Sequence, residues 1–209
     1  MRQSIHRFTV ALAAALLLAT LAAPTAFAQE APDALVKRVA DDVIATIKAD
    51  PQIQAGNAAR IHEVMESKLL PNFDFARMTA LAMGKNWRAA TPEQQQRLIA
   101  EFRMLLVRTY SGALTKYRDE KIEYKPLRAA PGDTDVTVRT AVLKPGGAPI
   151  QIDYSMGKTP AGWKAYDVIV GGVSLVTNYR DEFNDQIRTG GVDGLIKVLT
   201  DKNKGVAAK

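Results

Sequence analysis

The segment at residues 162–183 constrains the fold most, because its hydrophobic period changes halfway along. Up to Val170 the apolar residues follow the alternation and the short apolar run of a β-strand. From Leu175 onward they recur at helical spacing. Gly171 and Gly172 separate the two patterns, and glycine adopts backbone angles that other residues avoid. We therefore expect a sheet to pass into a helix at a flexible glycine corner, with two apolar faces turned toward each other.

The first 28 residues have the composition of an export signal. Arg2 and Arg7 precede an Ala/Leu/Val-rich run over 8–23, and the small residues before position 29 suit a signal peptidase. The run is shorter than the ~20 residues that a membrane-spanning helix needs. No cysteine follows it, so a lipoprotein anchor is excluded. We expect cleavage after Ala28 and a soluble exported chain of residues 29–209.

The charge of the chain is concentrated in one stretch. Residues 84–128 hold ten Lys and Arg against five Asp and Glu. Such a band favours an anionic lipid or an acidic partner surface, and it is equally typical of the solvated side of a helix. The absence of cysteine means that the exported chain is stabilised by its core without disulfides.

Helical patterns stand before and after a block of short strands. The four helices predicted first are at 31–50, 57–70, 74–83 and 91–117. The last of them starts at a capping box of Thr91 and Gln94, with Pro92 at the first helical position. Short loops join the strands, which indicates antiparallel neighbours. These four strands are predicted at 121–126, 134–143, 150–156 and 163–170.

These elements predict a single α+β domain over 29–209. We expect a four-stranded antiparallel meander of NTF2- or cystatin-like type, with the helices packed on one face of the sheet. The expected order is N-terminal helices at 29–90, the long helix at 91–120, the sheet at 121–170, and two C-terminal helices at 174–202.

The search for catalytic chemistry is negative. His62 is the single histidine after residue 28, which excludes sites and relays that need several imidazoles. Asp74 is interpreted as a helix cap, and Asp167 as a partly buried acid paired with a nearby Arg or Lys. No phosphate-binding loop or dinucleotide motif occurs. We predict a binding protein rather than an enzyme, with no catalytic residue, no metal and no cofactor.

Several short motifs then occur in the order seen in a known family. They include Phe73-Asp74-Phe75, Gly84-Lys85-Asn86-Trp87-Arg88, Thr91-Pro92-Glu93-Gln94, Tyr166-Asp167-Val168, Gly172-Val173-Ser174 and Asn178-Tyr179-Arg180. On these residues the chain resembles the MlaC, or toluene-tolerance, family of periplasmic phospholipid-binding proteins over nearly all of 29–209. It departs from the family pattern at Gly171, where many members carry an acidic residue.

The resemblance implies a fold in which helices and a curved sheet enclose an apolar cavity for acyl chains and leave the headgroup near solvent. It also implies a monomeric phospholipid carrier of the Mla pathway that maintains the lipid asymmetry of the outer membrane. Its partners would be an outer-membrane lipoprotein–porin complex and an inner-membrane ABC transporter with its substrate-binding ring. The phospholipid would be cargo rather than a cofactor.

The expected lipid contacts are apolar residues of the sheet and of the helices that face it: Phe102, Leu106, Tyr110, Val138, Ile152, Tyr154, Tyr166, Val168, Val170, Val173 and Val176. In or beside the family motifs, Arg77, Lys85 and Arg88 are expected to lie near a headgroup phosphate or a partner. Periodicity does not distinguish an apolar cavity from a filled core. A small exported NTF2-like enzyme and an adaptor protein with a filled core therefore remain alternatives.

Overall fold

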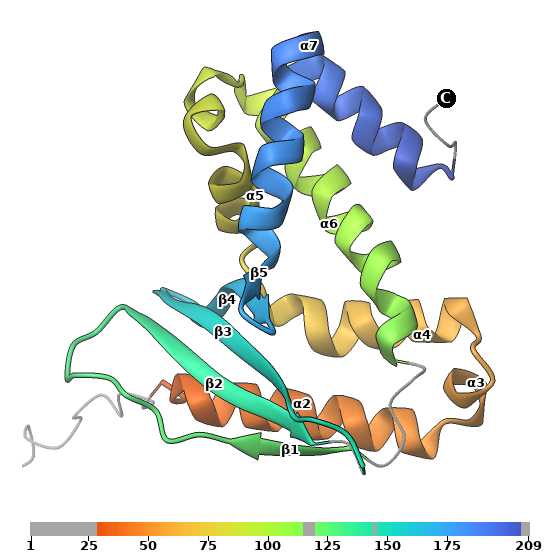
Figure 1. The fold of residues 1–209 in the computed structure, drawn as a ribbon, viewed down its shortest axis with the longest axis vertical. Coiled ribbons are helices and arrows are strands. Elements are labelled where there is room, and N and C mark those ends of the chain that lie inside the picture. Colours follow the sequence, from red (N-terminus) through yellow and green to blue (C-terminus); the bar gives the residue numbers. More distant parts are fainter. Residues whose placement is uncertain (1–28, 115–119, 144–145, 206–209) are drawn as a thin grey trace, which may run out of the picture.

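The computed structural model describes residues 29–114, 120–143 and 146–205. The expected export signal, the expected continuation of the long helix to residue 117 and the last four residues lie outside these ranges. Figure 1 shows a sheet lying along α2 at one end of the molecule and α5, α6 and α7 standing over it at the other. The α+β class expected from the sequence is confirmed.

The N-terminal part consists of helices and short helical turns. They are α2 (Pro32–Ala49), α3 (Pro51–Gln54), α4 (Ala58–Val64), the π-helical turn η1 (Met65–Leu69) and the 3-10 turn η2 (Leu70–Asn72). The sequence predicts one α-helix over 57–70, which the structure divides at Met65. Pro71 has no N–H and so removes one bond of the α-helical ladder. The side-chain amide of Asn72 instead donates to the carbonyl oxygens of Lys68 (2.8 Å) and Leu69 (3.3 Å).

Two of the following helices begin at side-chain caps. The carboxylate of Asp74 accepts a hydrogen bond from the N–H of Arg77 at 2.9 Å, which confirms its interpretation as a cap. The predicted capping box is also confirmed: Thr91 N–H donates to the Gln94 side chain (3.0 Å), and Gln94 N–H donates to the Thr91 hydroxyl (3.3 Å). The elements of this part are α5 (Phe75–Met83), the 3-10 helix η3 (Gly84–Ala89) and α6 (Pro92–Leu114).

The antiparallel sheet has five strands in the order β1-β2-β3-β4-β5, one more than predicted. Gly171 and Gly172 have φ of +58° and +85° and form a two-residue turn, across which Val170 pairs with Val173. The glycine corner is therefore a tight hairpin. The fifth strand has only two residues, too few to show the alternation of apolar and polar residues that marks a strand in the sequence. The strands are β1 (Lys121–Tyr124), β2 (Asp135–Leu143), β3 (Ile150–Thr159), β4 (Gly162–Val170) and β5 (Val173–Ser174).

The final helical segment, α7 (Leu175–Asn203), consists of two helices that meet at a kink, which confirms the two C-terminal helices expected from the sequence. Gly191 lies within it at φ 67° and ψ −170°, a conformation that costs little for glycine. Figure 1 shows α7 rising from β5 and turning back at its far end. The second part of α7 returns along α6, where the Asn203 side-chain amide donates to the carbonyl oxygen of Glu101 at 2.9 Å.

Asp167 connects β4 to the start of α7. Its carboxylate accepts hydrogen bonds from the N–H groups of Val168 (2.9 Å) and Val176 (3.1 Å) and from the hydroxyl of Ser174 (2.5 Å). Ser174 is the N-cap of α7 and accepts from the N–H of Thr177 at 3.0 Å. No Lys or Arg of the described residues pairs with Asp167 as expected, because the N–H of Val168 and the N–H and hydroxyl groups at the start of α7 bond to its carboxylate instead.

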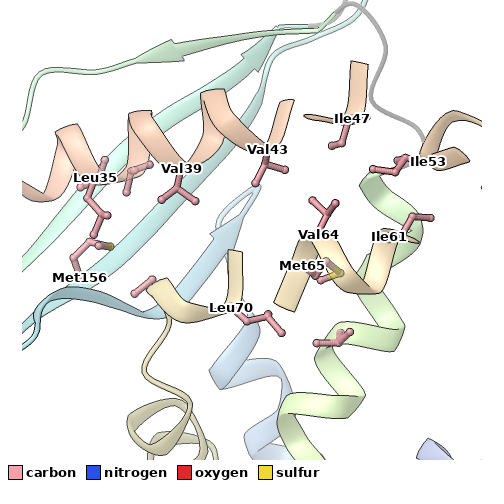
Figure 2. Packing of buried hydrophobic residues seen from close by; sticks show 14 of the residues in the cluster. Leu35, Val39, Val43, Ile47, Ile53, Ile61, Val64, Met65, Leu70 and Met156 are labelled. Atoms are coloured by element: carbon pink, nitrogen blue, oxygen red, sulfur yellow. The ribbon is translucent and has the colours of Figure 1, made fainter. Parts of the chain in front are cut away.

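The hydrophobic core consists of two clusters with no buried residue in common. The first cluster joins α2, α3, α4 and η1 to the sheet, and Figure 2 shows α2 packed over Met156 of β3 and the η1 region. The second cluster joins α5, α6 and α7. Phe73 and Phe75 pack against both, with ring centroids 5.9 Å apart. Members of the first cluster include Val39, Ile47, Val64, Val136 and Met156; members of the second include Met78, Leu98, Phe102, Val176 and Phe183.

Replacing Asp167 with Ala should lower the free energy of unfolding by about 1–3 kcal/mol, because the start of α7 loses its carboxylate acceptor. Urea denaturation measures the change. Asp181→Ala, at an exposed position of α7, is the control and should stay within about 0.5 kcal/mol of wild type. Equal losses in the two variants would contradict the capping role.

Candidate functional site

Five of the expected lipid contacts form one strip on the sheet, called here the apolar strip. Val138, Tyr154 and Val168 lie opposite one another across β2, β3 and β4, and Ile152 pairs with Val170 two positions along. Directly opposed residues of antiparallel strands share a face. Val138 is 2% exposed, Ile152, Tyr154 and Val168 are half-buried, and Val170 is 39% exposed. The strip therefore emerges from the first cluster and opens toward the β4–β5 hairpin, where Val173 extends it.

The expected contacts on the helices are mostly core residues. Phe102, Leu106 and Val176 are buried in the second cluster. The ring of Phe102 lies edge-on to that of Phe183, with centroids 5.1 Å apart. Tyr110 differs from these, since it is 37% exposed one helical turn beyond Leu106 on α6.

Tyr154 places a phenol within the apolar strip. Burial raises its pKa to about 12, and a hydrogen bond with Thr140 acts in the opposite sense. The hydroxyl of Thr140 also donates to the carbonyl oxygen of Ile152 at 2.7 Å. The strip is thus apolar apart from the hydroxyl groups of Tyr154 and its neighbour Thr140, which bond within the protein.

Tyr166 does not share the face of the apolar strip. A β-bulge at Ser155/Met156 shifts the register of β3 and β4, and Ala165 rather than Tyr166 lies opposite Met156. The Tyr166 ring instead lies beside Gly157 on the opposite face, which we call the outer face. Burial raises the pKa of its hydroxyl.

Of the three expected headgroup contacts, Arg77 has partners within the protein. Its guanidinium carbon lies 3.5 Å from the centroid of the Tyr166 ring, and its Nη2 donates to Asp135 at 2.5 Å. This hydrogen bond lowers the pKa of the Asp135 carboxyl. Lys85 and Arg88 are exposed on η3.

Sequence reasoning did not assign Asn86 and Arg180 a role, although both belong to the family motifs. The Asn86 amide donates to the side-chain oxygen of Asn184 at 2.8 Å, and Nε of Arg180 donates to the carbonyl oxygen of Leu81 at 3.1 Å. These bonds join α7 to α5 and η3. The motif residues therefore stabilise the helix packing, a role that a motif match alone does not reveal.

The expected enclosed cavity is not found at the apolar strip among the residues that the structure describes. A depression of about 380 Å³ lies elsewhere, between α6 and the second part of α7, and is lined largely by polar and charged residues such as Arg97, Asp193 and Lys197. Within the described ranges no three His, Cys, Asp or Glu side chains gather as metal ligands. In those same ranges no helix is both long and apolar enough to cross a membrane.

The alkaline titration of Tyr154 should be late. Its folded-state pKa of about 12 lies above the ordinary value of 10.0, so its contribution to stability is complete below pH 10 and is lost as the pH rises toward 12. Phenolate absorbance of wild type minus that of Tyr154→Phe isolates this residue, while circular dichroism monitors folding. A midpoint near pH 10 in folded protein would contradict burial of the phenol.

Comparison with known proteins gives a consistent result. The family model described as MlaC protein matches residues 37–201. The chain is 28% identical over 190 residues to the toluene tolerance protein ttg2D of Pseudomonas putida, covering 90% of this chain and 85% of the relative. It is 24% identical over 183 residues to the intermembrane phospholipid transport system binding protein MlaC of Haemophilus influenzae, covering 86% of each.

A solved structure shares both fold and sequence with this chain. It is the phospholipid-binding protein from Ralstonia solanacearum in complex with a phospholipid, with 45% identity and a TM-score of 0.78. The match covers 84% of this chain and 98% of the other. The family model spans most of the chain in addition. By these matches, the chain belongs to the MlaC protein family.

Proposed function

We propose that this protein is a phospholipid carrier that holds acyl chains against the apolar strip. The observation that carries the proposal is the graded exposure of the strip, from a fully buried Val138 to Val170 at 39% and Val173 at 58%. A contiguous apolar strip that reaches the surface is typical of a ligand-binding or interaction site. The phospholipid in the structure of the Ralstonia relative supports a lipid as the occupant.

The split of the core also supports this proposal. The first and second clusters share only the half-buried rings of Phe73 and Phe75 among the described residues. Apart from these rings and Val107 of α6, which belongs to the first cluster, the two cores are filled separately, so the boundary between them can widen at a modest cost in buried surface. We place the acyl chains at this boundary, over the strip and beside Tyr110 of α6.

The energetics favour a carrier with weak headgroup selectivity. Each buried CH₂ contributes about 0.8 kcal/mol relative to water. Burying two long acyl chains completely would therefore contribute at most a little over roughly 20 kcal/mol. A bilayer offers the same chains nearly the same free energy. The protein therefore shields lipid in transit, and partner complexes set the direction of transfer.

The finer proposal places this carrier in the periplasm. Residues 1–28 would be removed as a signal peptide, and 29–209 would form one lipid-binding domain that acts as a monomer without a cofactor. The name of the Haemophilus relative, an intermembrane phospholipid transport system binding protein, supports exchange between two membranes. We propose an outer-membrane lipoprotein–porin complex and an inner-membrane ABC transporter as partners, and outer-membrane lipid asymmetry as the result. Lys85 and Arg88, exposed on η3, would contact a partner or a headgroup.

Protein recovered from the periplasm should carry near-stoichiometric phospholipid. Mass spectrometry of an organic extract identifies the lipid, and the intact mass should correspond to a chain that begins at Gln29. A lipid-free extract, together with no uptake of phospholipid from vesicles, would exclude the carrier function. A chain that keeps residues 1–28 would exclude only the proposed export signal.

Val170→Asp should lower the affinity for lipid at least about tenfold and leave the fold intact, because the carboxylate would be desolvated only when acyl chains cover it. Met104→Asp is the matched control, since Met104 is 51% exposed on α6 outside the strip. Lipid retained on extraction and the thermal midpoint are measured for both variants. Equal lipid retention in the two would place the acyl chains away from the strip.

A further inference from the structure

We infer that Arg77 is a positioning residue for lipid exchange: it clamps α5 onto the outer face of the sheet and thereby limits how readily the apolar strip is uncovered. This inference rests on the proposed function. It concerns the rate at which lipid enters and leaves, not the contacts that hold the acyl chains.

The side chain of Arg77 contacts three strands. It leaves the first turn of α5 and crosses onto the outer face, where Nη2 bonds to Asp135 of β2 at 2.5 Å. Its guanidinium carbon lies 3.5 Å from the ring centroid of Tyr166 on β4, a cation–π distance. Gly157 of β3 lies beneath the same guanidinium. One side chain therefore ties a helix to β2, β3 and β4 together.

Gly157 provides the space that this clamp occupies. A Cβ at this position would lie 2.4 Å from Nη1 of Arg77 and 3.4 Å from the Tyr166 ring. Gly157 is not among the glycines with positive φ, so its backbone conformation does not require glycine. The absence of a side chain is explained by the guanidinium that lies over it.

The helix that Arg77 holds is coupled to the rest of the helical group. Met78 and Met83 of α5 are buried in the second cluster with α6 and α7. Arg180 of α7 donates to the carbonyl oxygen of Leu81 on α5 at 3.1 Å. A displacement of α5 from the sheet therefore moves the second cluster relative to the first.

Lipid entry requires such a displacement. The described residues leave no enclosed cavity at the apolar strip, so acyl chains can be covered only if the helices and the sheet first move apart. The Arg77 contacts join these two parts on the side opposite the strip. These Arg77 contacts must therefore break when the helices move away and uncover the strip.

The clamp is of moderate strength, which suits a contact that opens repeatedly. The side chains of Arg77 and Asp135 are 39% and 48% exposed, and ion pairs at such positions contribute little by themselves. Stacking on the Tyr166 ring adds to the ion pair. Loss of the clamp should therefore accelerate lipid transfer by about three- to tenfold.

The test follows a fluorescent phosphatidylethanolamine as it passes from loaded protein to acceptor vesicles of phosphatidylethanolamine and phosphatidylglycerol. Arg77→Met keeps an unbranched side chain that suits a helix but removes the guanidinium, and Asp135→Asn removes the charge of its partner. Both should accelerate transfer, and the double variant should be no faster than Arg77→Met. Asp42→Asn is the matched control, because the Lys68–Asp42 pair (2.8 Å) joins α2 to η1 on one side of the boundary; its rate should be unchanged.

Gly157→Ala provides a test that leaves every charge in place. The added methyl group would displace the guanidinium and accelerate transfer, and the same substitution should have no effect in the Arg77→Met background. This variant also keeps the inference testable if Arg77→Met folds poorly.

The outcomes separate the clamp from other roles. Unchanged transfer rates in Arg77→Met, Asp135→Asn and Gly157→Ala would overturn the inference while leaving the carrier function in place. Weaker binding in Arg77→Met that depends on the headgroup, with no effect of Asp135→Asn, would also overturn it and make Arg77 a headgroup contact. No transfer by the wild-type protein would instead reject the proposed function.

Discussion

The sheet has one apolar face that α2 and the η1 region cover at one end only, and the remainder of the structure follows from this constraint. Helix α2 and the η1 region cover the end that carries Val136 and Met156. The helices of the second cluster bury their apolar residues chiefly against one another. The apolar strip next to the covered end, with Tyr154 and Val168 among its residues, is only half-buried. The folded chain buries both clusters but leaves the apolar strip incompletely buried.

Polar contacts hold the helices in place without crossing this strip. Asp167 fixes the start of α7 through backbone N–H groups and Ser174, and Arg77 fixes α5 through Asp135 and Tyr166. Both sets of bonds lie away from the apolar strip. Charged and hydrogen-bonded groups thus position the helices, while the surface left for acyl chains stays apolar. This separation suits a protein whose proposed ligand is recognised through its tails.

Much of the fold could be predicted from local pattern. The caps at Asp74 and Thr91 depend on residues three positions apart, and the structure confirms both. The fifth strand was missed because two residues have no period. The sequence predicts a Lys or Arg as the partner of Asp167. Its pattern of charges does not show that the start of α7 lies close to this carboxylate and bonds to it instead. Tyr166 was placed with the strip because alternation along β4 does not reveal a bulge.

The sequence by itself determined the element types, the antiparallel meander and the family, because periodicity, caps and motifs are local properties of the chain. The tertiary structure decided which apolar residues are core and which are half-exposed. Leu106 and Val170 are both apolar positions of regular elements, yet one is 7% and the other 39% exposed. That difference arises from the helices that pack over each position. Burial depends on neighbours distant in sequence, so only the assembled fold distinguishes a filled cluster from a surface open to a ligand.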